Sequence, residues 1–381
     1  MIDLREGDCR EIMRALPENS VDSIVTDPPY EIGFMAKKWD ASGVAFNPAT
    51  WREALRVLKP GGHLLAFGGT RTYHRMVCAI EDAGFEIRDQ LGWAYGSGFP
   101  KSHNGDWGGT ALKPAWEPIC MARKPLIGTV EANWLVWGTG GLRIDECRVE
   151  GMKGTPASPR RAKQGAAYGE LGNDPGTGSG WDASVGRWPA NLVHDGSDEV
   201  IEAFPQAVGQ IANASSSETR KNQNCYGEMR RGRGDEPSAD SENNGAVGFN
   251  MRPGMRRLDA GSAARFFYCA KASKSDRNAG CENLPPTTTD GRAVATDNAY
   301  QRGKTERNNH HPTVKPTALM QWLVRLVTPR GGVVLDPFTG SGSTGRGCVF
   351  EALSFIGCEM HAPYLEIARA RIAAAEAEVL W

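Results

Sequence analysis

The stretch that decides the fold is VDSIVTDPPY, residues 21–30. Its first six residues, Val21–Thr26, have the apolar and β-branched content of a short strand, and the prolines that follow end that strand. In open α/β sheets, ligands bind beyond the carboxyl ends of the strands. The tetrapeptide Asp27-Pro28-Pro29-Tyr30 is therefore expected at a place where a ligand can bind.

The chemistry of this tetrapeptide suits an amino group. Pro28 and Pro29 have no N–H donors and hold the backbone extended, which leaves carbonyl oxygens facing outward. The Asp27 carboxylate and a neighbouring carbonyl form two acceptors aimed at one place, and these match the two donors of an exocyclic NH₂ group on a base. Tyr30 adds a ring on which a base can stack. A strand that merely ends in a turn is the alternative interpretation.

Around this stretch, residues 1–123 have an α/β pattern, and the pattern returns at residue 311. The first part predicts helices at Trp51–Leu58 and Thr72–Ala83 and strands at His63–Gly68, Glu86–Trp93 and Glu117–Ala122. The last part predicts helices at Thr317–Thr328 and Tyr364–Val379 and strands at Val333–Leu335 and Ser354–Cys358. Each part supplies only about half of a doubly wound sheet, so we expect both to form one mostly parallel α/β sheet with the middle looped out.

The middle segment, residues 124–310, is rich in glycine, serine and proline and has no long periodic stretch, which predicts loops. Two islands inside it, Arg187–Val200 and Ala263–Ala272, have the pattern of ordered structure. Basic side chains gather over residues 220–234 and 252–277 and predict contacts with nucleic-acid phosphates, although a solvated basic face is the alternative. The candidate DNA contacts are Arg230, Arg231, Arg233, Arg256 and Arg257.

Composition excludes several classes of function. The 381 residues carry a formal net charge of −1, so any positive charge that grips nucleic acid must be local. The nine cysteines include no CxxC pair, and their spacings suit neither a zinc site nor a disulfide framework. No apolar run approaches the roughly 20 residues needed to span a bilayer, and the first residues lack the pattern of a signal sequence. We therefore expect a cytoplasmic protein with reduced thiols and no metal site.

A second constellation is DPFTGSG, Asp336–Gly342, which lies between a predicted strand and a predicted helix. Its glycines permit a tight turn, and the N-terminus of the helix after Ser343 attracts a carboxylate. Such a turn also suits phosphates, dinucleotides or no ligand at all. Glu359, at the end of the next strand, can accept hydrogen bonds from ribose hydroxyls or can be a solvated carboxylate.

Two further stretches allow two interpretations each. Asp8 can bond an adenine amino group, or it can cap the helix expected to start near Arg10. HPTVKP, residues 311–316, fixes an extended entry to a helix, and its Thr313 and Lys315 offer donors for a carboxylate. An ordinary lead-in to a helix is the alternative for this stretch.

Three segments in this order resemble the permuted beta group of DNA amino-methyltransferases: GDCREIMRALPENSVDSIVTDPPY (7–30), HPTVKP (311–316) and DPFTGSGSTG (336–345). The resemblance covers residues 1–123 and 311–381. It implies that these form one catalytic and cofactor-binding domain with a circularly permuted, Rossmann-like methyltransferase fold, and that residues 124–310 are a target-recognition insertion. WPANLVHDG (188–196) and FFYCAKASKSDR (266–277) resemble segments of phage- and prophage-type members.

The resemblance also implies roles for individual residues. It implies that Asp27, Pro28, Pro29 and Tyr30 hold the target base. It implies that S-adenosylmethionine is bound by Asp336, Pro337, Phe338, Thr339, Gly340, Ser341 and Gly342, with Glu359 on the ribose, Asp8 and Cys9 beside the adenine, and Thr313 and Lys315 at the methionine end. The DPPY form favours adenine N6 as the target, whereas SPPY is commoner for cytosine N4.

Together these inferences predict a site-specific enzyme that flips adenine out of double-stranded DNA and methylates its N6 by direct SN2 transfer. Cytosine-N4 methylation is the nearest alternative, and a catalytically idle DNA-binding protein on the same scaffold is the second. An NAD-dependent oxidoreductase would fit the glycine-rich turn but would leave DPPY unexplained. The same residues leave open two further partners, a second copy of the chain in a homodimer and a cognate restriction enzyme.

Overall fold

The structure is a computed structural model that describes residues 1–33, 38–98, 104–149, 186–208, 260–270, 273–289 and 305–379, and the pairs 223–224, 227–228, 243–244 and 250–251. The chain divides into two compact units. The first consists of Met1–Arg148, Trp188–Ile201 and Phe267–Trp381, and the second of Val149–Arg187 and Glu202–Phe266. The predicted DNA contacts Arg230, Arg231, Arg233, Arg256 and Arg257 lie outside the described residues.

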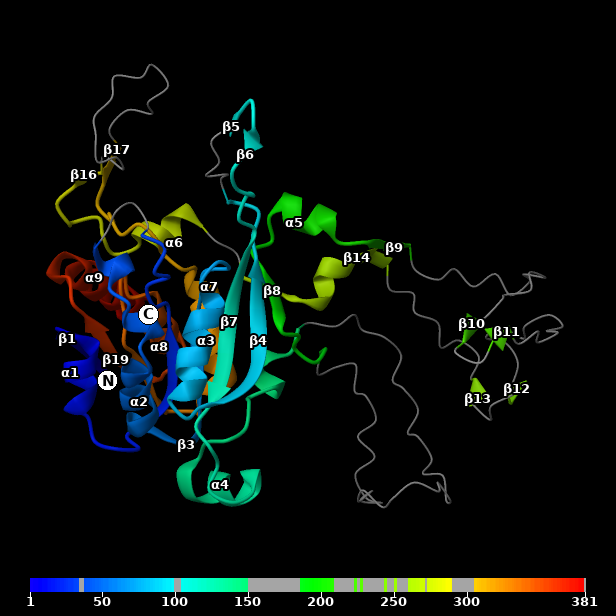
Figure 1. Cartoon of the computed structure of the whole chain (residues 1–381), viewed down its shortest axis with the longest axis horizontal. Coiled ribbons are helices and arrows are strands. Elements are labelled where there is room, and N and C mark those ends of the chain that lie inside the picture. The colour runs from blue at the N-terminus through cyan, green and yellow to red at the C-terminus, as the bar shows by residue number, and fades with distance from the viewer. Residues whose placement is uncertain are drawn as a thin grey trace. The chain divides into compact units, whose positions relative to one another are not determined.

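Within the described residues, the first unit is built on a nine-stranded sheet (Figure 1). In spatial order the strands are β1 (Ile2–Glu6), β19 (Ser354–Glu359), β18 (Val333–Asp336), β2 (Val21–Thr26), β3 (Leu58–Phe67), β7 (Trp116–Arg123), β4 (Glu86–Ala94), β8 (Leu192–His194) and β15 (Tyr268–Cys269). β7 runs antiparallel to both of its neighbours, and the other pairs are parallel. The mostly parallel α/β sheet that the sequence predicts is therefore confirmed.

The two ends of the chain meet inside this sheet. β18 pairs in parallel with β2, with Val334 opposite Ser23 and Leu335 opposite Ile24. Residues 1–123 and 311–381 thus contribute to a single sheet, as expected. The edge strand β1, which local sequence patterns do not predict, pairs with β19.

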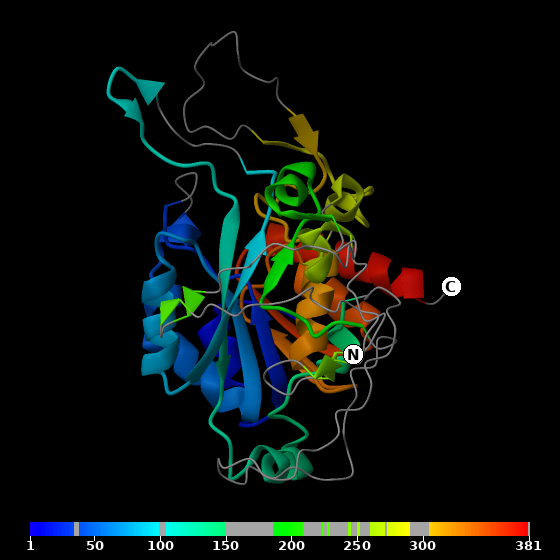
Figure 2. The same cartoon turned by 90° about the vertical axis from the view of Figure 1, so that its right-hand side faces the viewer.

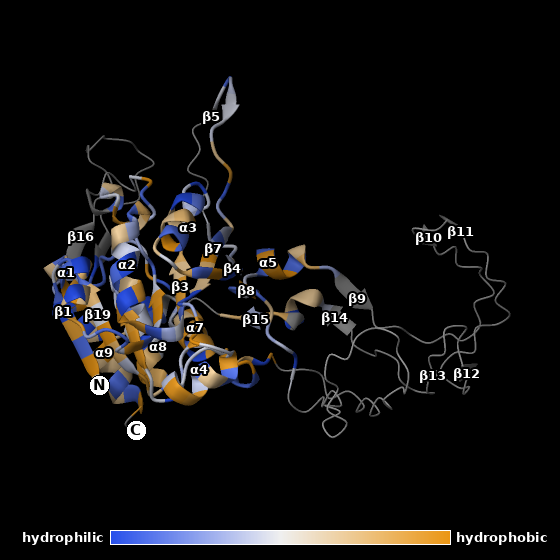
Figure 3. Cartoon of the chain, turned by 60° about the horizontal axis from the view of Figure 1, so that its bottom comes forward, coloured by the Kyte–Doolittle hydropathy of each residue, from blue (hydrophilic) through white to orange (hydrophobic). Residues whose placement is uncertain are grey.

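Helices cover both faces of the sheet. One layer contains α1 (Cys9–Arg14), α2 (Pro48–Val57) and α3 (Tyr73–Asp82), and the other contains α7 (Thr317–Val327), α8 (Ser343–Phe350) and α9 (Ala362–Val379). Along β3, Leu64 packs with the first layer and Leu65 with the second, which explains a continuous apolar run in a strand buried on both faces. Figure 3 shows hydrophobic and hydrophilic residues together on α1 and α2, as expected of helices with one face in the core. None of the described helices has the length and apolar character needed to cross a bilayer.

The boundary between α2 and β3 differs from the prediction. The helix starts at Pro48, because Asn47 caps it by accepting a hydrogen bond from the Ala49 N–H at 2.9 Å. The helix ends at Val57, and the Lys-Pro-Gly-Gly stretch that follows, residues 59–62, belongs to β3, which begins at Leu58. Gly61 is required there because a Cβ would lie 2.5 Å from Asn133 Nδ2, and the Asn133 amide donates to the Pro60 carbonyl at 2.9 Å.

Both predicted islands contribute strands to the main sheet. Residues 187–200 contain β8, which pairs with β4, and residues 263–272 contain β15, which pairs with β8. The first unit also includes α4 (Val130–Trp137) and α6 (Lys274–Asn278). This unit therefore extends well into the span 124–310 that was assigned to the insertion. Strands of two or three residues give almost no periodic signal, so only tertiary pairing reveals them.

Candidate active site

The predicted constellations line one pocket at the carboxyl edge of the sheet. Its volume is about 1830 Å³. Asp27–Tyr30 follow β2, Asp336 ends β18 and Pro337–Ser341 follow it, and Glu359 ends β19. All of these residues line the pocket. Because the three strands are parallel, their carboxyl ends share an edge. Tyr30 and Phe338 thus lie on the walls of the same cavity. The predicted direct transfer of a methyl group requires this, because the base and the cofactor must meet in one place.

Asp27 has one engaged and one available oxygen. Its Oδ2 lies 3.1 Å from Lys315 Nζ. Its Oδ1 is buried and has no hydrogen-bond partner among the described residues. Burial raises the pKa of Asp27, the Lys315 ammonium lowers it, and the nearby Glu117 raises it. A buried acceptor without a donor is unfavourable unless a ligand supplies the donor.

Lys315 lies at the centre of a buried polar group. Its Nζ is 2.8 Å from Glu117 Oε2 and donates to the Tyr30 hydroxyl at 2.9 Å, and that hydroxyl donates to Glu117 at 3.1 Å. Burial alone would lower the pKa of Lys315, but the carboxylates of Asp27 and Glu117 raise it, so the amine stays charged. The ammonium therefore lies with the catalytic candidates. This placement differs from the expected contact with the methionine end of a cofactor.

Sequence reasoning missed Glu117 and the aromatic residues around it. Glu117 is a charged side chain in the otherwise apolar strand β7. A charged residue in a buried strand indicates a functional role, and this was the sequence signal that could have identified Glu117. Trp93 and Tyr95 line the pocket from the neighbouring β4 end, with their ring centroids 4.8 Å apart. Thr72 holds the end of the Asp27–Tyr30 tetrapeptide in place, because its hydroxyl donates to the Tyr30 carbonyl at 2.6 Å.

The turn after β18 is shaped by Gly340 and Glu359. Gly340 has φ +53°, in the left-handed region that favours glycine, and a Cβ there would lie 2.8 Å from His311 Nε2. Its N–H donates to Glu359 Oε2 at 2.8 Å, and the His361 N–H donates to Glu359 Oε1 at 2.8 Å. Burial raises the pKa of Glu359. Each carboxylate oxygen keeps a second lone pair for a hydroxyl donor.

Gly342 has a different role from the expected contact with a cofactor. Its φ is +77°, and a Cβ would lie 2.9 Å from Ala368 Cα on α9. It is absent from the pocket lining, whereas Asp336, Pro337, Phe338, Thr339, Gly340 and Ser341 are all present there. Gly342 therefore allows the first turn of α8 to pack against α9.

Asp336 positions the turn from inside the protein. It is 2% exposed and accepts hydrogen bonds from the hydroxyls of Thr26 and Thr344, both at 2.6 Å, and from the Phe338 N–H at 3.0 Å. Burial raises the pKa of Asp336 to about 6, although the hydroxyls of Thr26 and Thr344 lower it. These bonds connect the end of β2 with the turn and with α8. Asp336 is thus a positioning residue.

Replacing Asp336 with alanine is expected to lower the free energy of unfolding by about 2 to 4 kcal/mol, because two buried hydroxyls lose their acceptor. Since the turn loses its anchor, affinity for a ligand in the turn should fall about tenfold or more. Thermal unfolding and calorimetric titration with S-adenosylmethionine measure the two effects. The exposed Asp82→Asn is the control. Unchanged affinity in Asp336→Ala would contradict the positioning role.

Asp8 and Cys9 line the far end of the pocket. Asp8 caps α1 by accepting from the Arg10 N–H at 2.8 Å, and it also pairs with the Arg10 guanidinium at 2.6 Å. These hydrogen bonds lower the pKa of Asp8. The capping interpretation is therefore confirmed, and Asp8 remains within reach of a ligand in the pocket.

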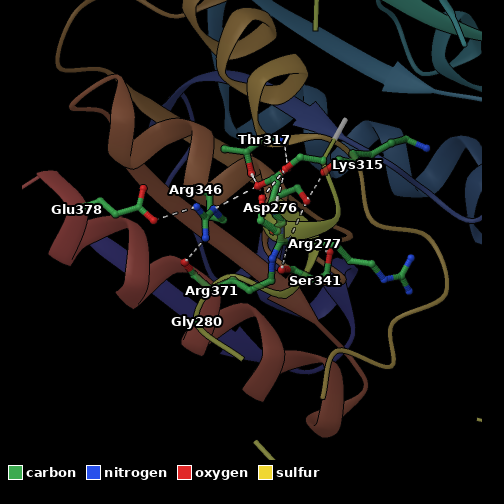
Figure 4. A network of polar contacts seen from close by, with 12 residues as sticks. Asp276, Arg277, Gly280, Lys315, Thr317, Ser341, Arg346, Arg371 and Glu378 are labelled. Atoms are coloured by element: carbon green, nitrogen blue, oxygen red, sulfur yellow. Dashed lines mark hydrogen bonds and ion pairs between the residues drawn. The ribbon is translucent and has the colours of Figure 1, made fainter. Parts of the chain in front are cut away.

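A buried network holds HPTVKP against the glycine turn (Figure 4). Arg371, which is fully buried, donates to the Ser341 carbonyl at 2.7 Å and to the Ser343 hydroxyl at 2.9 Å, and Ser343 donates to the Lys315 carbonyl at 2.8 Å. Asp276 caps α7 by accepting from the Thr317 N–H at 2.8 Å. Asp276 and Arg277 thus help to build the site, although the sequence predicts that they belong to the insertion.

The remaining predicted residue, Thr313, lines the pocket beside two residues that sequence reasoning missed, His311 and Arg277. Burial lowers the pKa of His311 to about 3, so its ring is neutral near pH 7. Its Nδ1 and the Arg277 Nε are buried with no hydrogen-bond partner among the described residues. Arg277 donates through its Nη2 to the His311 carbonyl at 2.6 Å. These atoms can serve a polar ligand.

Comparisons with known proteins identify curated relatives that match part of this chain. YubD of Escherichia coli (strain K12), which is named a methylase, is 38% identical over 91 residues, 23% of this chain and 40% of YubD. Type II methyltransferase M2.DpnII of Streptococcus pneumoniae is 42% identical over 64 residues, 17% of this chain and 24% of that protein. The chain thus spans less than half the length of these curated relatives.

Solved structures that match this chain include the M1.HpyAVI–SAM complex, with a TM-score of 0.42 and 16% identity over 98% of this chain and 99% of that one. The PvuII DNA methyltransferase (cytosine-N4-specific) has a TM-score of 0.48 and 14% identity over 100% and 92% of the two chains. The family model N6_N4_Mtase, described as DNA methylase, matches residues 21–370. The chain therefore belongs to the N6_N4_Mtase family of DNA methylases.

Proposed function

We propose that this protein transfers a methyl group from S-adenosylmethionine to adenine N6 in double-stranded DNA. The observation that carries the proposal is Asp27 Oδ1, a buried acceptor without a partner among the described residues, in a pocket that also contains the glycine turn. Family membership supports the reaction class. The DPPY form of the tetrapeptide favours adenine N6 over cytosine N4 as the acceptor.

The residues around Asp27 suit a weakly nucleophilic amine. The lone pair of an exocyclic amino group is delocalised into the ring of the base. Asp27 Oδ1 and the Pro28 carbonyl accept its two N–H donors and localise that pair. With all three side chains ionised, Asp27, Glu117 and Lys315 carry a formal net charge of −1. A fixed negative group stabilises the positive charge that develops on the nitrogen more than it stabilises the neutral amine.

The residues of the turn fit S-adenosylmethionine. Gly340 leaves open the space that a side chain would fill, and Glu359 keeps lone pairs for ribose hydroxyls. The unpartnered Nε of Arg277 and Nδ1 of His311 are polar atoms that suit a zwitterionic methionine group. When bound, the cofactor supplies an electrophilic methyl carbon on a sulfonium. Phe338, which lines the pocket, is available to pack on its adenine.

The size of the pocket supports two occupants. Ligand pockets commonly measure about 300 to 1,000 Å³, and this one is about 1830 Å³. A flipped base and a nucleoside cofactor both require space, and Trp93, Tyr95 and Tyr30 supply aromatic walls for the base. The base must leave the duplex because its amino group cannot meet the methyl carbon in line inside the stack.

The experiment that tests this function uses the purified chain, S-adenosylmethionine with a labelled methyl group, and unmethylated duplex DNA. The DNA is then digested to nucleosides, and the label is expected in N6-methyladenine. Label in N4-methylcytosine would overturn adenine as the target base, but the proposal that the protein methylates DNA would stand. Cofactor binding without label in any nucleoside would overturn the enzymatic proposal and favour an idle scaffold. Sequencing of modified DNA from a methylation-free host then identifies the target site.

A further inference from the structure

A narrow hairpin projects from the first unit beside the pocket. It consists of β5 (Asn104–Gly105) and β6 (Gly108–Gly109), which pair in antiparallel register, and its two loop residues are Asp106 and Trp107. Both Figure 1 and Figure 2 show this hairpin extending beyond the main sheet. Trp107 at its tip is 78% exposed. Burial of an aromatic residue is strongly favourable, so an indole held in water at a tip is a candidate contact surface.

The turn itself does not require a tryptophan. Two-residue hairpin loops favour Asn, Asp and Gly, because these adopt the positive φ that the turn demands. Here Gly108, with φ +90°, supplies the positive φ next to the loop. The ring lies over Gly105, where a Cβ would come within 2.6 Å of it. Glycines on both sides of the loop keep the tip thin and leave the outer face of the indole open.

The hairpin is continuous with the wall of the pocket. After the hairpin, Thr110–Trp116 all line the pocket, and β7 then begins and carries Glu117. Trp107 is three residues before Thr110, which is at most about 10 Å of extended chain, or roughly three base-pair steps of duplex. Glu117, in the cluster around Asp27, is ten residues from Trp107, so a duplex that has its base in the pocket and runs past Thr110 would lie within reach of the indole.

We propose that Trp107 is a wedge that stacks into the DNA duplex next to the flipped base. This inference rests on the proposed function. Flipping leaves a gap in the stack and an unpaired partner base, and apolar side chains can be inserted between base steps to fill such gaps. The indole offers a large flat face for this purpose. Residues 104–116 contain one acidic and one basic residue, Asp106 and Lys113, so the contact depends on stacking and not on net charge.

The test compares Trp107→Ala with Trp134→Ala in the full chain. Trp134 is a matched control, because it is 58% exposed on α4, at the opposite end of the first unit in both views. Methyl transfer is measured on a duplex, on single-stranded DNA of the same sequence, and on a duplex with an abasic nucleotide opposite the target base. Stacking on an aromatic ring supports an expected loss of about 5- to 100-fold in kcat/KM for Trp107→Ala on the intact duplex.

On single-stranded DNA, Trp107→Ala should stay within about threefold of wild type, because no gap in a stack has to be filled. The abasic duplex should give an intermediate loss, and Trp107→Phe should restore most of the activity on the intact duplex. The slope of affinity against salt should be unchanged, because no phosphate contact is removed. Equal losses on all three substrates, or no loss on the duplex, would overturn the wedge. Absence of methyl transfer by the wild-type chain on every substrate would instead overturn the proposed function.

Discussion

Replacing Asp27 with alanine is expected to reduce methyl transfer by about 10³-fold or more while S-adenosylmethionine still binds within about threefold of wild-type affinity. The loss follows because Asp27 Oδ1 is a buried acceptor in the pocket that has no hydrogen-bond partner among the described residues. Lys315 keeps Glu117 and Tyr30 as partners, so the cluster persists. The cofactor turn is anchored by hydrogen bonds from Thr26 and Thr344 to Asp336, and Asp27 takes part in neither of them. Single-turnover transfer and calorimetric titration measure the two quantities.

Asp27→Asn refines this test. The amide keeps the shape and one neutral acceptor but loses the negative charge, and hydrogen bonds to charged groups are about twice as strong as neutral ones. We therefore expect a smaller loss, about 10- to 100-fold. The exposed Asp82→Asn should behave as wild type. Transfer by Asp27→Ala at a rate close to wild type would show that the base is held by other groups.

Replacing Lys315 with methionine is expected to reduce transfer at pH 7 by about 100-fold and to move the acid limb of the pH–rate profile to higher pH. Asp27 must be ionised to accept the amine, so activity is lost as pH falls through its pKa. The Lys315 ammonium lowers that pKa. Without the ammonium, no positive charge lies between the Asp27 and Glu117 carboxylates, and their repulsion raises the pKa of Asp27. Lys315→Arg keeps the positive charge, so the acid limb of its pH–rate profile should lie at the same pH as in the wild-type protein.

Glu117→Gln is expected to move the same limb in the opposite direction. Glu117 raises the pKa of Asp27, so its removal lowers that pKa and shifts the limb to lower pH. Profiles of log kcat against pH for the three chains measure both shifts. A purely structural role for the cluster would lower the rate at every pH without moving the limb, and shifts in the same direction for both variants would contradict the electrostatic account.

The ionisation of Asp27 also makes the free energy of unfolding depend on pH. Burial holds the pKa of Asp27 above its ordinary value, so its contribution to the free energy of unfolding is largest below the unfolded pKa and is lost as pH rises. Lys315 offsets that loss in the wild-type chain by lowering the pKa. Lys315→Met should therefore lose stability between acid and neutral pH more steeply than wild type. Denaturant unfolding across that range measures the difference.

Local patterns were enough to predict much of the site. The strand β2 and its DPPY end, the strand β18 and its glycine turn, and the helix before it follow from short-range hydrophobic patterning and from the backbone limits of proline and glycine. The cap at Asp8 follows from local side-chain chemistry as well. Each of these features depends on residues a few positions apart, and so each is visible in the chain itself.

The sequence alone determined that two strand–turn units with complementary chemistry exist and that neither end could complete a sheet without the other. The tertiary structure alone determined which distant residues contact those two strand–turn units. Lys315 lies 285 positions from Tyr30, and Glu117 reaches the same cluster from β7. Gly342 proved to serve helix packing, and short strands from the middle segment complete the sheet. These outcomes depend on contacts between distant segments, whose geometry is set by the packed sheet and is absent from any local pattern.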